Sequence, residues 1–175
     1  TLPCSFMLVA AMNPCPCGYY NDPHHPCTCR PGQVQRYMSR ISGPLLDRID
    51  LQVEVVPVSV RELSSAPAGE SSAAIRTRVV AARRRQAARF SDCPGVHCNA
   101  QMAARHIKAF VHLDESAHTA LEQALDRLGL SARAYERVLK VSLTLADLDG
   151  VDQITRTHIA EAISYRNLDR ASWGE

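Results

Sequence analysis

The spacing of apolar and polar residues predicts a β-type beginning followed by helices. Residues 6–12 form a short, continuously apolar run, which is typical of a strand covered on both faces, as in a parallel sheet. Residues 51–57 alternate and are rich in β-branched side chains, so they predict a second strand. Between the two, residues 33–41 have helical spacing, and residues 45–49 can add a helical turn.

From residue 73 onward the spacing predicts only helices, which together form a bundle. The expected helices span residues 73–90, 99–110, 114–128, 131–148 and a last segment that begins at the cap Thr155. Four residues of the first helix are expected to face inward: Ile75, Val79, Ala82 and Phe90. Ile154 and Ile159 stand on either side of the last N-terminus, where a hydrophobic staple would form.

Residues 64–72 are rich in Ser, Ala, Pro and Gly, which predicts a linker. We therefore expect an α/β part over residues 1–63 and a helical part over residues 73–175. No apolar run approaches the roughly 20 residues that a membrane span needs, and no signal peptide is recognisable. The chain starts with Thr1 and enters its first strand almost at once, which suggests a part of a longer protein.

Charge changes this picture only locally. The chain is 46% hydrophobic and 22% charged, which is ordinary for a globular protein, and its net charge of +2 is too small to indicate nucleic-acid binding. Six arginines nevertheless crowd the helix predicted over residues 73–90: Arg76, Arg78, Arg83, Arg84, Arg85 and Arg89. Arg78, Arg85 and Arg89 share one face, which could meet DNA phosphates, an acidic neighbouring subunit or solvent alone.

Four of the seven cysteines lie within fifteen residues, as Cys15, Cys17, Cys27 and Cys29. In a reducing cytoplasm, where we expect this protein, such clustering favours a metal over disulfides. Four thiolates can complete a closed tetrahedral zinc site, so we expect a structural Zn²⁺ that orders the Pro-rich segment 15–32. His24 or His25 could replace one thiolate, and free thiols or disulfides are the alternatives.

Several motifs, in chain order, resemble one known family. They are the run 6–12, Asn13-Pro14, Cys15-Pro16-Cys17-Gly18, the segment 42–50 and the segment 130–135. These look like the magnesium-chelatase-like AAA+ ATPases, in their ComM-like (YifB-like) bacterial branch. The resemblance covers nearly the whole chain and implies an α/β plus α fold. It would be the C-terminal part of an AAA+ parallel-sheet core with a Cys-rich zinc insert, followed by an α-helical lid.

The resemblance also implies roles for three residues. Asn13 resembles sensor 1, Arg48 resembles the arginine finger with Asp47 as its orienting neighbour, and Arg133 resembles sensor 2, with Arg137 as a competitor for that role. Taken from the residues alone, Asn13 could simply end a strand, Arg48 could pair with a neighbouring acid, and Arg133 could be an ordinary exposed helix residue. The family's frequent Ala-Arg-Thr stands here as Ser142-Leu143-Thr144, so one arginine is missing.

The activity implied is that of a ring of identical subunits, a hexamer, that hydrolyses Mg-ATP and remodels DNA by branch migration in natural transformation. The sequence contains no G-x-x-x-x-G-K-[ST] motif, so the chain alone is expected to hydrolyse little ATP. A magnesium-chelatase-type ATPase subunit and a non-enzymatic zinc-binding interaction module are the alternatives.

Overall fold

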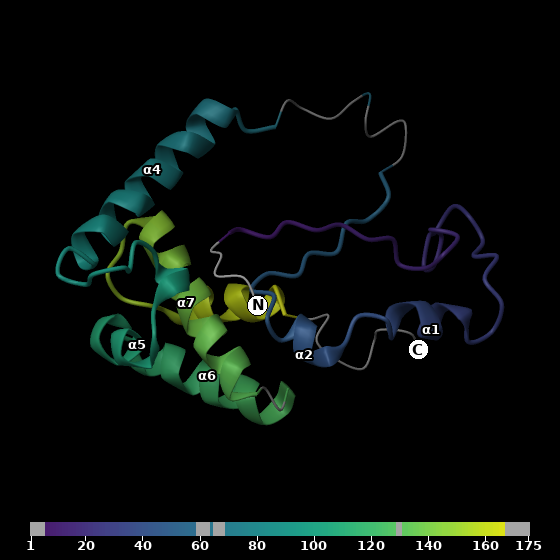
Figure 1. Ribbon diagram of the computed structural model, residues 1–175. Coiled ribbons are helices and arrows are strands. Elements are labelled where there is room, and N and C mark those ends of the chain that lie inside the picture. The colour runs from purple at the N-terminus through teal and green to yellow at the C-terminus, as the bar shows by residue number, and fades with distance from the viewer. Residues whose placement is uncertain (1–5, 59–63, 65–68, 129–130, 167–175) are drawn as a thin grey trace. The chain divides into compact units, whose positions relative to one another are not determined.

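The computed structural model describes residues 6–58, 64, 69–128 and 131–166, and these form two compact units that meet in sequence between Ser42 and Gly43 (Figure 1). Within these residues the regular structure is helical and contains no strand. None of the described helices is both long and apolar enough to cross a membrane.

The two predicted strands are not formed. Residues 6–12 and 51–57 have no regular secondary structure, and their apolar side chains are largely exposed, with Met7 at 88% and Val55 at 86%. A strand is stable only when a neighbour pairs with its backbone and covers its apolar face. No described segment forms a strand ladder with either run, so the sheet predicted from their composition is absent within these residues.

The first unit contains one helix, α1 (Gln33–Met38), which follows Gly32 in a left-handed conformation with φ of 74°. It confirms the helix predicted over residues 33–41, although the last residues form turns instead. In the second unit, α2 (Gly43–Leu46) and the turn after it match the expected helical turn, because the amide of Ile49 donates to the carbonyl of Leu46 at 3.0 Å.

The rest of the second unit is the predicted helix bundle. Its elements are α4 (Ser72–Arg89), the 3₁₀ turn η1 (Asn99–Gln101), α5 (Ala104–Phe110), α6 (Glu115–Leu128), α7 (Ala132–Asp149) and α8 (Arg156–Ser164). The helix predicted over 99–110 is divided, because Met102 and Ala103 have extended backbone that carries Met102 into the core. The linker predicted at 64–72 includes residues 65–68, which lie outside the described residues.

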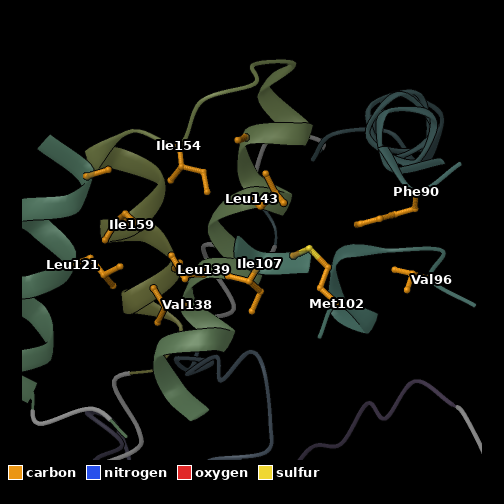
Figure 2. Close-up of a cluster of buried hydrophobic side chains, with 13 residues drawn as sticks. Phe90, Val96, Met102, Ile107, Leu121, Val138, Leu139, Leu143, Ile154 and Ile159 are labelled. Carbon is orange, nitrogen blue, oxygen red and sulfur yellow. The ribbon is translucent and has the colours of Figure 1, made fainter. Parts of the chain in front are cut away.

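The core of the bundle lies around α7 (Figure 2). Val138, Leu143, Ile154 and Ile159 are its largest fully buried apolar side chains. Ile154 is held from both sides of its backbone, since its amide donates to the carbonyl of His112 at 3.0 Å and its carbonyl accepts from the amide of Asp114 at 3.1 Å. The predicted staple positions, Ile154 and Ile159, are therefore both confirmed as core.

Local capping explains where three of these helices begin. The Ser131 hydroxyl accepts from the amide of Ala134 at 3.2 Å, as predicted for α7. Asp114 accepts from the amide of Ala117 at 2.6 Å at the start of α6. At α8 the ring of His158 reaches back, and its Nδ1 accepts from the amide of Thr155 at 3.0 Å.

Only two of the four residues of α4 that were expected to face inward are buried. Ala82 and Phe90 are buried, but Ile75 and Val79 are exposed by 42% and 46%. Every residue from 71 to 81 is exposed, so the first half of the helix extends beyond the other helices of its unit (Figure 1). The apolar spacing of α4 therefore continues past the surface that the bundle covers.

Leu143→Ala should lower the free energy of unfolding by about 2 to 5 kcal/mol, because Leu143 is 1% exposed and its loss leaves a cavity. Urea denaturation of both proteins measures this. Val79→Ala is the control, and it should change stability by less than about 0.5 kcal/mol because Val79 lies on the uncovered half of α4. A Val79 effect as large as that of Leu143 would show that this half of α4 is packed.

Candidate metal centre and exposed arginines

Four cysteine sulfurs of the first unit converge, as the spacing predicted. The Sγ atoms of Cys15, Cys17, Cys27 and Cys29 all lie within 4.8 Å of one another. The Sγ of Cys15 is 3.3 Å from that of Cys17 and 3.8 Å from that of Cys27, and the Cys17 and Cys27 sulfurs are 3.5 Å apart. Cys15 is completely buried, so the cluster also provides the only buried side chain of this unit's described residues.

The loop around the cysteines is shaped by tight turns. The amide of Gly18 donates to the carbonyl of Cys15 at 3.0 Å, and Gly18 has a φ of 87°, which other residues rarely adopt. Asp22 accepts from the amides of His24 and His25 at 2.7 and 2.9 Å. These hydrogen bonds hold the pKa of Asp22 below its usual value, and the bond from the amide of His24 contributes most.

Neither histidine joins the cluster. The His25 ring lies against the Tyr19 ring with centroids 5.0 Å apart, and its Nδ1 is 3.5 Å from the carboxylate of Asp22. His24 is exposed, and the convergent group within the described residues consists of the four cysteines alone. The arrangement therefore favours four thiolate ligands over a mixed set with one imidazole.

The sulfur positions fit a tetrahedral metal centre. Zn–S bonds of about 2.3 Å at tetrahedral angles place the sulfurs about 3.8 Å apart, close to the separations found here. A disulfide would require a sulfur separation of about 2.05 Å, and all four cysteines are free thiols. Four protein ligands would leave no open position, so such a centre stabilises structure and carries out no chemistry of its own.

The thiols also influence one another electrostatically. A hydrogen bond from the backbone of Tyr19 lowers the pKa of Cys17 to about 5. A hydrogen bond with the backbone of Cys17 would lower the pKa of Cys29, but partial burial and the three neighbouring thiols outweigh it and raise that pKa to about 12. Adjacent sulfurs resist ionising together, and a divalent cation among them would remove this obstacle.

Asn13 lies in the same unit, two residues before the first cysteine. It ends the extended segment and is exposed. Its Nδ2 would lie 3.8 Å from a Cβ placed on Gly18, so the Asn13 side chain lies beside the first turn of the cysteine loop.

In the second unit, Arg48 stands on an exposed turn that packs on the bundle. Its Nη1 donates to the carbonyl of Pro44 at 2.5 Å. Asp47, the expected orienting neighbour of Arg48, instead accepts from the hydroxyl of Ser131 at 3.2 Å. Asp50 forms an ion pair with Arg137. Arg48 therefore has no ion pair with either neighbouring acid in the described part of the chain.

Arg133 lies in the first turn of α7 and is exposed. Arg137, its competitor, is engaged by Asp50, which leaves Arg133 as the arginine without an ion pair among the described residues of this turn. Because Asp47 contacts Ser131, the Arg48 turn lies beside the N-terminus of α7. The structure thus brings the turns of Arg48 and Arg133 together, and the guanidinium is a side chain whose planar fork matches phosphate oxygens.

One polar cluster was not predicted. Asp147 is buried in α7, and its carboxylate accepts from Arg89 at 2.8 Å, from Asn99 at 2.8 Å and from Gln86 at 3.2 Å. The Nε of Arg85 lies 3.6 Å from the same carboxylate. A signal existed in the sequence, because Gln86 and Arg89 share a helix face with the buried Ala82 and so place polar groups on the side that packs.

This cluster changes the meaning of the basic face on α4. Arg85 and Arg89 bind Asp147, and Arg78 pairs with Glu70 at 2.7 Å. The three arginines that share a face are thus paired within the chain. The arginines of α4 without a described ion pair are the exposed Arg76, Arg83 and Arg84.

Comparison with known proteins adds the evolutionary context. Residues 1–63 match the family model described as magnesium chelatase, subunit ChlI, and residues 69–166 match the model described as magnesium chelatase, subunit ChlI C-terminal. The chain is 46% identical over 172 residues (97% of the chain) to the uncharacterized protein YifB of Escherichia coli. It is 43% identical over 169 residues (96%) to the competence protein ComM of Haemophilus influenzae. It is 38% identical over 164 residues (94%) to the uncharacterized protein Rv2897c of Mycobacterium tuberculosis. It spans about a third (32%) of the length of these curated relatives.

The Asp147 cluster predicts a pH-dependent stability. Burial alone would raise the pKa of Asp147, but hydrogen bonds from Arg89 and Asn99 and the charge of Arg89 outweigh burial and keep that pKa below its usual value. The stabilisation is therefore complete above about pH 4 and is lost as the pH falls through the lowered pKa. At about pH 7, Asp147→Asn should cost about 3 to 5 kcal/mol, because it leaves Arg89 unpaired.

Urea unfolding between about pH 7 and pH 3 tests this, and the difference between variant and wild type should shrink as the pH falls. The exposed Asp126 offers a control, since Asp126→Asn should change stability by less than about 0.5 kcal/mol at every pH. A difference for Asp147→Asn that stays constant down to the lowest pH would contradict the ionic role.

Proposed function

Because the chain belongs to the magnesium chelatase family, together with YifB and ComM, we propose that it forms about a third of a ring-forming, Mg-ATP-dependent AAA+ motor. The reaction proposed is DNA remodelling by branch migration in natural transformation, as the likeness to the competence protein ComM suggests. The observation that carries the proposal is the pairing of two exposed arginine turns, those of Arg48 and Arg133, through the contact between Asp47 and Ser131.

These arginines suit the chemistry of phosphoryl transfer. Catalysis of that reaction is almost entirely positioning and electrostatic stabilisation of the phosphate oxygens. Arg48 would act as the arginine finger on a nucleotide bound by the neighbouring subunit of a hexamer, and Arg133 would act as sensor 2. Asn13 would contact the phosphate, or orient the attacking water, as sensor 1. ATP bound with Mg²⁺ supplies the phosphoryl group, and the groups that grip both would come from the part of the motor outside this chain.

The uncovered apolar segments support the same proposal. The apolar side chains of residues 6–12 and 51–57 are largely exposed, although their composition suits buried strands. In the proposed motor they would pair with strands from the two thirds of the protein that this chain does not span, and so complete an AAA+ parallel sheet. Left unpaired, such edges are prone to associate with other chains.

We propose that the four cysteines bind a structural Zn²⁺ in a cytoplasmic protein. The convergent sulfurs, their separations and their free-thiol state support this assignment. The metal would stabilise a loop with four prolines that buries little apolar surface of its own.

The purified protein should contain one zinc per chain, and Cys15→Ser should lose it, because three thiolates and a hydroxyl make a poorer site. Metal analysis measures the content, and Co²⁺ substitution should produce the absorption spectrum of a tetrahedral thiolate centre. Cys93→Ser is the matched control and should keep the metal, since Cys93 lies outside the cluster. A metal-free protein whose mass shows two disulfides would contradict the assignment.

The motor is tested by ATP hydrolysis of the full-length protein with and without branched DNA. We expect DNA to stimulate hydrolysis and Arg48→Ala to lower kcat by about 10³-fold or more, since arginine fingers contribute that much. Arg127→Ala removes an equally exposed arginine from the same unit and should leave the rate unchanged.

The other outcomes separate the rival functions. Hydrolysis that is indifferent to DNA would favour a magnesium-chelatase-type subunit, which the names of the matching family models suggest. No hydrolysis under any condition would favour an interaction module held together by zinc. Full activity in Arg48→Ala would remove Arg48 from the proposed site.

A further inference from the structure

Arg166 contacts both residues that flank Arg48. Its side chain is only 1% exposed, although it carries a permanent charge. Its Nη1 donates to the carbonyl of Ile49 at 3.0 Å, and its Nη2 lies 3.7 Å from a carboxylate oxygen of Asp47. One guanidinium thus holds the chain immediately before and immediately after an exposed arginine.

Further contacts fasten the same turn to the bundle. The amide of Gln52 donates to the carbonyl of Tyr165 at 2.8 Å, and Asp50 pairs with Arg137 on α7. The turn is thereby tied to α7 and to the end of α8, the two helices that pack against each other in the core. By contrast, the Arg48 side chain has one described hydrogen bond, to the carbonyl of Pro44 within its own turn. Its position therefore depends on where the turn is held.

Only arginine suits the Arg166 position. The planar guanidinium reaches a carbonyl and a carboxylate at the same time from a fixed fork. A lysine at this position would present a single ammonium and could serve one of the two acceptors well. A neutral side chain of similar length would fill the space but hold neither.

We propose that Arg166 is the positioning residue of the Arg48 turn, so that the proposed finger moves as one body with α7, which carries Arg133. This inference rests on the proposed role of Arg48 in phosphoryl transfer. A guanidinium displaced by about 1 Å from a developing charge can cost about 10² in rate, so loosening the turn should impair kcat. Binding of ATP should change little, because the Arg166 side chain is only 1% exposed and faces the turn itself.

The test compares steady-state ATP hydrolysis by full-length wild type, Arg166→Met, Arg166→Lys, Arg48→Ala and the double variant Arg48→Ala/Arg166→Met. We expect Arg166→Met to lower kcat about 10²-fold with KM for ATP nearly unchanged, and Arg166→Lys to recover part of the loss. In the Arg48→Ala background, Arg166→Met should cause no further loss, because it acts through Arg48.

A matched control and a second measurement separate positioning from general damage. Arg89→Met removes another largely buried arginine of the same unit, which pairs with the buried Asp147, and it should lower stability without lowering kcat. Hydrogen exchange on the full-length proteins should be at least about tenfold faster over residues 47–52 in Arg166→Met, while the core of α7 keeps its protection.

The outcomes are distinct for the two proposals. If Arg48→Ala loses activity but Arg166→Met does not, or if the two losses multiply in the double variant, the positioning role is overturned and the proposed motor stands. If Arg48→Ala keeps full activity, Arg48 is not the arginine finger, and the positioning role proposed for Arg166 is overturned as well. Unchanged hydrogen exchange over residues 47–52 in Arg166→Met would show that Arg166 does not hold the Arg48 turn, and would overturn the proposal.

Discussion

The burial of one face of α7 is the interaction on which the rest of the helical unit depends. Val138, Leu143 and Ala146 of that face are almost completely covered by the surrounding helices. Burying a side chain of the size of Val138 or Leu143 contributes roughly 1.5 to 3 kcal/mol, which is large beside the net stability of a domain. The same burial places Asp147 where only charged and amide partners can satisfy it. The N-terminus of α7 lies at the edge of the core, where it receives the Arg48 turn.

The first unit is organised by a different constraint. Its described residues bury one side chain, Cys15, and contain one helix of six residues, so a hydrophobic core does not hold the loop together. Convergence of four sulfurs takes the place of such a core. Small units with little apolar surface commonly depend on a metal or on cross-links for this reason. The proposed zinc in the first unit and the hydrophobic core in the bundle would each offset the entropy cost of ordering their part of the chain.

The contacts of the Arg48 turn suggest how the proposed motor divides its tasks. Arg48 follows α2, and the chain then enters residues 51–57, which in the proposed motor would pair with strands from the rest of the protein. The turn itself is held by Arg166, Ser131 and Arg137, all of which belong to the helix bundle. A shift of the bundle would therefore carry the proposed finger with it, and rigid-body coupling of this kind can link a nucleotide site to a moving domain.

Local sequence patterns were sufficient to predict much of the structure of this protein. Helix spacing and the Ser131 cap located the helices to within a few residues, and cysteine spacing alone indicated the cluster, because these features depend on neighbours in the sequence. Other features depend on which surfaces meet. Ile75 and Val79 have the spacing of core residues but lie past the covered part of α4, and the carboxylate of Asp47 contacts Ser131 and Arg166. Residues 6–12 have strand composition yet remain unpaired, because a strand needs a partner. Tertiary structure alone decided these points, since contact between distant segments determines burial, pairing and the partners of a charge.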